Sequence, residues 1–150
     1  MSAAPPAPPP APEPASLFKR FAAFCYDLLL LCGVVFFFTL AVLGLRGGRA
    51  IPPGTVWFEL ALAAVAMLFF GWFWTHGGQT LGMRAWRIRV IRADGGALRW
   101  TQAALRFWAA VLALLPLGLG LWWGAFDAQR RGWHDRWTGT RVVRVPSRPR

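Results

Sequence analysis

The sequence predicts an all-α membrane protein with two transmembrane helices, a third hydrophobic segment broken by proline and glycine, and a small cytoplasmic β-pairing. Hydrophobic residues make up 56% of the 150 residues and charged residues only 15%, against roughly 25% charged in soluble domains. The apolar residues gather in three long runs, and the net charge is +11. So few polar side chains exclude a soluble domain, and so many apolar ones exclude a disordered chain.

The chain begins with a proline-rich tail at residues 1–16, which holds seven of the twelve prolines. Such a segment is expected to be extended and unstructured. We therefore divide the chain into this tail, a membrane domain over residues 17–145 and a basic end at 146–150. The apolar run after the tail is too long for a signal-sequence core, so we expect it to be retained as a helix.

The first two apolar runs cover residues 21–45 and 56–74, and each contains one charge, Asp27 in the first and Glu59 in the second. About 20 helical residues, rising about 1.5 Å each, cross a hydrocarbon layer of roughly 30 Å. Tryptophans lie near the ends of the runs, where their rings favour the headgroup layer. Both runs are therefore expected to cross the bilayer.

The third run, residues 107–126, carries no charge but is interrupted by Pro-Leu-Gly-Leu-Gly at 116–120. A re-entrant hairpin and a continuous helix with a proline kink are both compatible with this pattern. If the run crosses, the basic residues divide into 8 and 9, whereas if it returns they divide into 15 and 2. Cytoplasmic loops carry the excess of Lys and Arg, which favours the hairpin and a cytoplasmic N-terminus. The arginine- and alanine-rich composition suggests a bacterial inner membrane.

Two short segments are predicted to pair as strands on the inner membrane face. Residues 84–92 alternate, with Trp86, Ile88 and Val90 on one face and arginines on the other. A turn at 94–96 follows, and residues 140–145 form a second β-prone stretch. We expect the flanking arginines to contact the anionic headgroups of the lipid bilayer rather than nucleic acid.

Three stretches carry a family resemblance: KRFAAFCYDLLLL at 19–31, GGQTLGMRAWRIRVIRADGG at 77–96 and RRGWHDRWTGTRVV at 130–143. Together the chain resembles the RDD family of membrane proteins over about residues 17–145. The family is named for one arginine and two aspartates, which fall here on Arg20, Asp27 and Asp135. The resemblance implies an integral membrane domain of largely unassigned role, with transport suggested and sodium–proton exchange linked to some members.

The candidate functional residues are the charges in or near the apolar runs. Asp27 lies about 10 Å inside the first helix, where an ionised carboxylate must be paired, protonated or in contact with water. Arg20, two turns earlier, and Arg106, at the start of the third run, are its candidate partners. Asp27 is then either a proton- or cation-binding group or one side of a helix-locking salt bridge. Asp135 is expected to bridge to an arginine within 84–92.

Two classes of function remain after the motifs are considered. The sequence contains no catalytic signature, cofactor motif or cluster of metal ligands, so neither enzymatic activity nor a metal or cofactor is expected. The first class is transport of an ion or small solute, which requires a homo-oligomer or a partner membrane protein because two helices and a hairpin enclose no path. The alternative is a membrane anchor or interaction module that presents a basic cytoplasmic face to lipids or a partner membrane protein.

Overall fold

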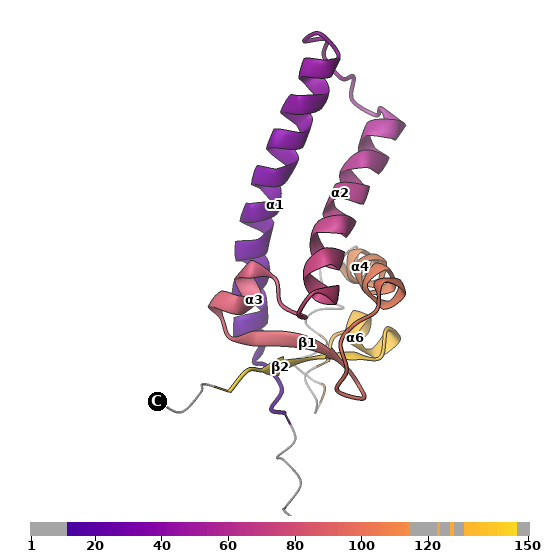
Figure 1. Cartoon of the computed structure of the whole chain (residues 1–150). Coiled ribbons are helices and arrows are strands. Elements are labelled where there is room, and N and C mark those ends of the chain that lie inside the picture. The colour runs from indigo at the N-terminus through magenta and orange to yellow at the C-terminus, as the bar shows by residue number, and fades with distance from the viewer. Residues whose placement is uncertain (1–11, 115–122, 124–126, 128–130, 147–150) are drawn as a thin grey trace, which may run out of the picture.

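The computed structural model of the chain describes residues 12–114, 123, 127 and 131–146. Two long helices, α1 (Leu17–Leu45) and α2 (Val56–Thr75), stand side by side and run in opposite directions (Figure 1). The other elements gather at one end of this pair, which we call the sheet end. They are α3 (Leu81–Ala85), β1 (Ile88–Arg92), α4 (Trp100–Leu114), α6 (Trp133–Trp137) and β2 (Thr140–Arg144).

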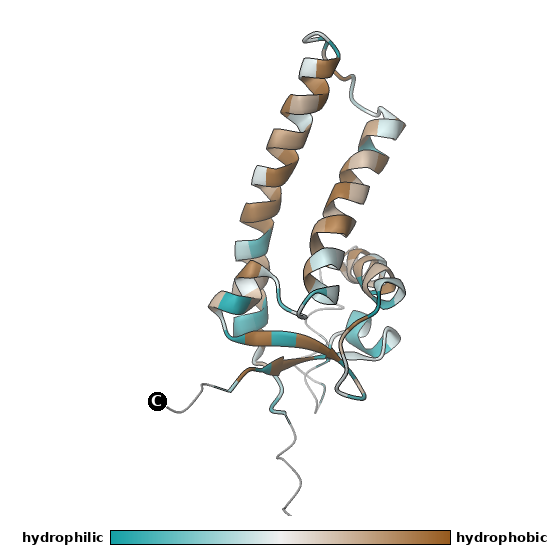
Figure 2. Ribbon diagram, in the orientation of Figure 1, coloured by the Kyte–Doolittle hydropathy of each residue, from teal (hydrophilic) through white to brown (hydrophobic). Residues whose placement is uncertain are grey.

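The helices α1 and α2 are long and apolar enough to cross a membrane, as the sequence predicts. Apolar residues cover most of their length, and the hydrophilic residues concentrate at the sheet end (Figure 2). Large side chains such as Leu29, Phe36 and Leu60 are exposed on their surfaces. A continuous exposed apolar surface of this kind is suited to lipid rather than water.

The predicted strand pairing is confirmed, with β1 and β2 antiparallel and Val90 opposite Val142. Ile88 and Val90 are buried, in agreement with the alternating pattern. The first strand is shorter than predicted, because residues 84 and 85 end α3 and Arg87 adopts a left-handed conformation with φ of 52°. Trp86 therefore leaves the strand, and its ring packs edge-to-face on Phe18 of α1 with the ring centres 5.7 Å apart.

The end of the proline-rich segment is attached to the sheet. Pro14 forms a bridge with Val143, and the peptide N–H of Ala15 donates to the carbonyl of Val142 at 3.0 Å. Residues 13–15, which the sequence places in an unstructured tail, thus extend the sheet at the edge of β2. Because α1 begins two residues later, this pairing fixes the start of the first long helix against the sheet.

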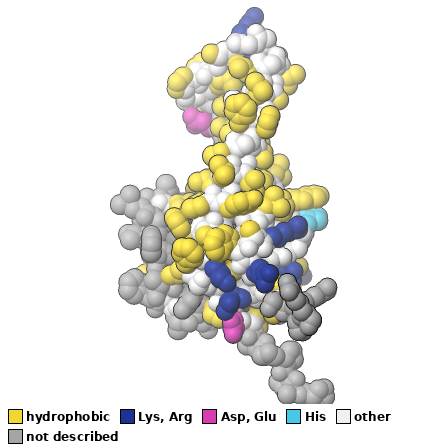
Figure 3. All heavy atoms as spheres, turned by 90° about the vertical axis from the view of Figure 1, so that its left-hand side faces the viewer, with side chains coloured by type: hydrophobic (Ala, Val, Ile, Leu, Met, Phe, Trp, Pro, Cys, Tyr) yellow, Lys and Arg dark blue, Asp and Glu magenta, His cyan; other side chains and the backbone are white. Residues whose placement is uncertain are grey.

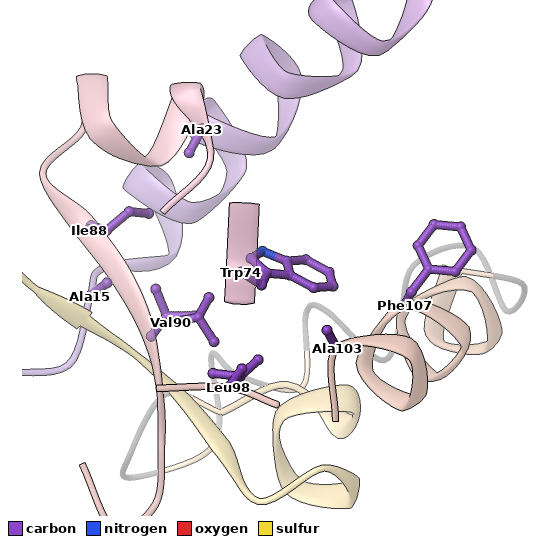
Figure 4. Close-up of a cluster of buried hydrophobic side chains, with 9 residues drawn as sticks. Ala15, Ala23, Trp74, Ile88, Val90, Leu98, Ala103 and Phe107 are labelled. Atoms are coloured by element: carbon purple, nitrogen blue, oxygen red, sulfur yellow. The ribbon is translucent and has the colours of Figure 1, made fainter. Parts of the chain in front are cut away.

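The apolar core lies at the sheet end, where the long helices meet the sheet and α4 (Figure 4). Trp74 at the end of α2 and Phe107 of α4 belong to this cluster, together with Ala23 of α1, Val90 of β1 and Leu98. These side chains come from every part of the fold. Their burial therefore holds the two long helices to the sheet.

The third apolar run is only partly described. Its first part belongs to α4, which starts at Trp100 and is seen nearly end-on in Figure 1, so that it runs across α1 and α2. The Pro-Gly stretch at 116–120 lies outside the described residues, so the structure does not test the choice between hairpin and kinked helix. The pairing of β1 with β2 places both ends of the connection 93–139 at the sheet end.

Candidate functional site

The structure separates the predicted charge network into two buried sites. Asp27 lies between α1 and α3, whereas Arg20 and Arg106 both bind Asp135. The expectation that Arg20 or Arg106 pairs with Asp27 is therefore wrong. The expected bridge from Asp135 to an arginine within 84–92 is also wrong, because the carboxylate faces α1 and α4 instead.

The first site is the carboxylate of Asp27, whose residue is 2% exposed. The hydroxyl of Thr80 donates to its Oδ2, and the peptide N–H of Gly82 donates to its Oδ1 at 2.8 Å. The Thr80 side chain also accepts from the peptide N–H of Met83 at 3.2 Å, which caps the start of α3. Asp27 and Thr80 thus accept from the peptide N–H groups of Gly82 and Met83. Both groups lie in the first turn of α3 and would otherwise lack partners.

Glycine at position 82 makes this contact possible. A Cβ atom there would lie 2.3 Å from the carbonyl oxygen of Ala23 and 2.9 Å from Cγ of Asp27. Gly78 is required nearby for a similar reason, since its φ is +69° and a Cβ would lie 2.4 Å from the carbonyl oxygen of Val90. The Gly-Gln-Thr-Leu-Gly stretch at 78–82 is therefore a close-fitting connector between α2 and α3 that passes Asp27. We call it, together with α3, the α3 connector.

The second site is centred on Asp135, whose side chain is completely buried. Nη1 of Arg106 lies 2.6 Å from Oδ1, and Nη2 of Arg20 binds Oδ2. Arg106 also donates to the hydroxyl of Thr140 at the start of β2. This ion cluster joins the neighbouring elements α6 and β2 to α1 and α4, which are distant from them in sequence.

The charges of the arginines control the ionisation of the Asp135 cluster. Burial opposes ionisation of Asp135, but the guanidinium groups of Arg106 and Arg20 outweigh it and hold the pKa of this carboxyl well below its usual range. Burial lowers the pKa of His134 to about 4, so its imidazole is neutral at pH 7. Its Nε2, 3.4 Å from Oδ1 of Asp135, therefore forms no ion pair there at neutral pH. The site holds two guanidinium groups and one carboxylate.

The ring of Trp74 provides a further contact for the buried guanidinium. Cζ of Arg106 lies 5.2 Å from the centre of this ring, a cation–π distance. Trp74 comes from the last turn of α2, so the second long helix also contacts the cluster. Arg106 and its partners thus join α1, α2, α4, α6 and β2.

Sequence reasoning missed the neutral partners of the charged residues. Thr80 and Gly82 appear in the Gly-Gln-Thr-Leu-Gly stretch that carries part of the resemblance, but nothing in that stretch indicates a contact with Asp27. From the sequence, Thr140 is only a strand residue and Trp74 only an aromatic near the end of a helix. The local signal was Thr80 itself, because threonine is preferred at helix N-caps and here precedes the first residue of α3.

The described residues offer no metal site, since no three His, Cys, Asp or Glu side chains among them are arranged to hold an ion. Cys25 and Cys32 are exposed free thiols on α1. The chemistry of both sites is thus that of buried carboxylates and their hydrogen-bond donors.

Two apolar helices joined at one end by buried carboxylates and arginines define a small helical membrane protein. Residues 14–139 match the RDD family, and the chain belongs to this family. No curated protein and no solved structure is significantly similar to it. Of the three residues to which the family's name points by resemblance, Arg20 and Asp135 form one ion pair, and Asp27 occupies a separate site.

Proposed function

We propose that this RDD protein transports a proton or a small cation across the bilayer, in the manner of sodium–proton exchange, with Asp27 as the binding carboxylate. The observation that supports this is that no described residue places a positive charge against the carboxylate of Asp27. It is almost fully buried, and its hydrogen-bond donors in the described structure, a hydroxyl and a peptide N–H, are both neutral. A buried carboxylate without a counter-ion is costly, and a bound proton or cation removes that cost.

Asp135 makes a useful contrast, because two guanidinium groups already neutralise it. A cation has no electrostatic reason to bind there. We therefore assign Asp135 to holding the fold together and Asp27 to the ion. The proposal thus gives different roles to the two aspartates of the family name.

The orientation proposed for the chain places the sheet end in the cytoplasm of a bacterial cell, with the inner membrane around α1 and α2. Exposed arginines lie at position 84 in α3, at position 87 between α3 and β1, and at position 89 in β1. Figure 3 shows basic side chains gathered below the apolar surface at this end. Such a basic rim favours anionic headgroups of the cytoplasmic leaflet. A reporter enzyme fused after residue 150, active only in the cytoplasm, tests this orientation.

Transport by this chain requires more than one copy or a partner membrane protein. Two long helices lying side by side enclose no path between them, and α1 exposes most of its apolar surface. We therefore propose a homo-oligomer. Its mass in detergent, measured by light scattering with the detergent contribution subtracted, tests this part of the proposal.

The decisive experiment is cation-driven proton flux in proteoliposomes, comparing the parent with Asp27→Asn at matched insertion. Asparagine keeps the size of the side chain but cannot carry the negative charge. We expect the flux to be lost while the oligomer persists. The matched control is Glu59→Gln, which removes an exposed carboxylate from the first turn of α2 and should leave the flux unchanged. Flux that survives Asp27→Asn refutes the proposal.

The second candidate is an anchor or interaction module, and one observation favours it. Both oxygens of Asp27 already accept hydrogen bonds from Thr80 and from the first turn of α3. This arrangement is also what a carboxylate with a purely structural role, holding α3 against α1, would show. In that case Asp27→Asn should weaken assembly or folding, and the parent protein should show no flux with sodium, potassium or lithium. The same set of proteoliposomes therefore distinguishes the two functions.

A further inference from the structure

The helix α4 has an unusual distribution of apolar and charged residues. Leu105, Trp108 and Leu112 lie on one face at helical spacing and are 63%, 48% and 55% exposed. The opposite face is buried and carries Arg106, which is only 3% exposed, beside Phe107. A helix that buries its charge and exposes leucine and tryptophan is the reverse of a water-facing helix. Its outer face therefore requires an apolar surrounding.

The position of α4 indicates what that surrounding is. The helix packs against the last turns of α2, where the rings of Phe70 and Phe107 lie 6.4 Å apart. The ring of Trp100 closely approaches Gly71, a position at which a Cβ atom would lie 2.8 Å from it. The exposed face of α4 is thus continuous with the apolar surface of a helix that can span the membrane. It lies at the sheet end of that surface.

The direction of α4 and the ends of its connection limit its path through a bilayer. It runs across α1 and α2 rather than along them (Figure 1). Along the chain β1 precedes α4, α6 and then β2 follow it, and the two strands are paired at the sheet end. Neither feature requires α4 to descend toward the bilayer centre.

We propose that α4 lies along the bilayer surface, in the headgroup layer of the leaflet at the sheet end, with Leu105, Trp108 and Leu112 inserted among the acyl chains. Its partner is the lipid surface itself. Tryptophan favours this layer, and the helix has the one-sided apolar face of interfacial helices. In this arrangement the buried face of α4 presents Arg106 to Asp135, so the ion cluster attaches the surface helix to the rest of the fold.

Depth measurements with spin labels test this proposal. Single cysteines replace Leu105 and Leu112 in a background with Cys25→Ala and Cys32→Ala, in vesicles of phosphatidylcholine containing phosphatidylglycerol. The two positions are seven residues apart, which is about 10 Å along a helix. A matched pair on α1, Phe21→Cys and Leu28→Cys, is also exposed, has the same spacing and lies entirely in the half of the apolar run nearer the sheet end. Accessibility to oxygen and to a water-soluble relaxation agent gives the depth of each label.

The expected result is that labels at positions 105 and 112 lie at equal shallow depth, in contact with lipid, while those at 21 and 28 differ by about 10 Å. A slope of about 10 Å along α4 indicates a helix that descends into the membrane, and it overturns the proposal. Labels that are accessible to water, or that are broadened by a neighbouring copy, also overturn it. Equal depths for the α1 pair would show that α1 does not cross the bilayer. This also overturns the proposal, which depends on two membrane-spanning helices.

Discussion

Replacing Asp135 by asparagine is expected to reduce the free energy of unfolding by about 3–5 kcal/mol, the range for removing one partner of a buried ion pair. Asparagine has nearly the same shape, so the change removes charge without opening a cavity. The residues left behind are Arg106, which is 3% exposed, and Arg20. Two guanidinium groups would then face each other without a carboxylate between them.

The magnitude is large because the contacts that Arg106 keeps in the described part of the chain are uncharged. Arg106 retains the hydroxyl of Thr140 and the face of Trp74, but both are neutral. The amide of the new asparagine can still accept one hydrogen bond, which keeps the loss below that of a large core deletion. The cost is therefore mainly that of an uncompensated buried charge.

The assay is reversible unfolding in mixed micelles with increasing denaturing detergent, followed by helical circular dichroism. The control is Asp94→Asn, which breaks an ion pair with Arg92 in which the aspartate side chain is 63% exposed and which should have no measurable effect. A double-mutant cycle with Arg106→Met isolates the pair. The Asp135→Asn change should cost at least about 1 kcal/mol less in that background. Equal stability of parent and Asp135→Asn, or a coupling energy of zero, contradicts the reasoning.

Three further predictions concern the connector, the histidine and the N-terminal segment. Gly82→Ala places a Cβ 2.3 Å from the carbonyl oxygen of Ala23 and should destabilise the protein by about 1–3 kcal/mol in the same unfolding assay, whereas Gly33→Ala, with open space around it, should not. The unfolded chain binds a proton at His134 below about pH 6.5, whereas the folded protein binds it only below about pH 4. The free energy of unfolding should therefore decrease as the pH is lowered from about 6.5 to about 4. His134→Gln should flatten that part of a stability–pH curve, and an unchanged slope would assign it to other groups. Ala15→Pro removes the N–H that donates to β2, and amide exchange at the edge of β2 should accelerate; unchanged protection would show that the segment is not held there in solution.

The sequence by itself determined the elements whose signal is local. The two long apolar runs became α1 and α2, which are long and apolar enough to cross a membrane, because length and hydropathy are read directly from the sequence. The alternation that buries Ile88 and Val90 likewise predicted β1. The sequence also required the carboxylate of Asp27 to be paired, protonated or in contact with water, because an ionised group inside an apolar helix is costly.

Only the tertiary structure decided which groups compensate these carboxylates. Arg20 is seven residues from Asp27 and 115 from Asp135, yet it binds the more distant one. Spacing along a helix indicates which residues share a face, but it contains no information about an element that returns from the other end of the chain. The α6 segment brings Asp135 beneath α1, and the α3 connector supplies neutral donors to Asp27. Because a buried charge takes the partner that the packing of all the elements leaves within reach, that choice is a property of the whole fold.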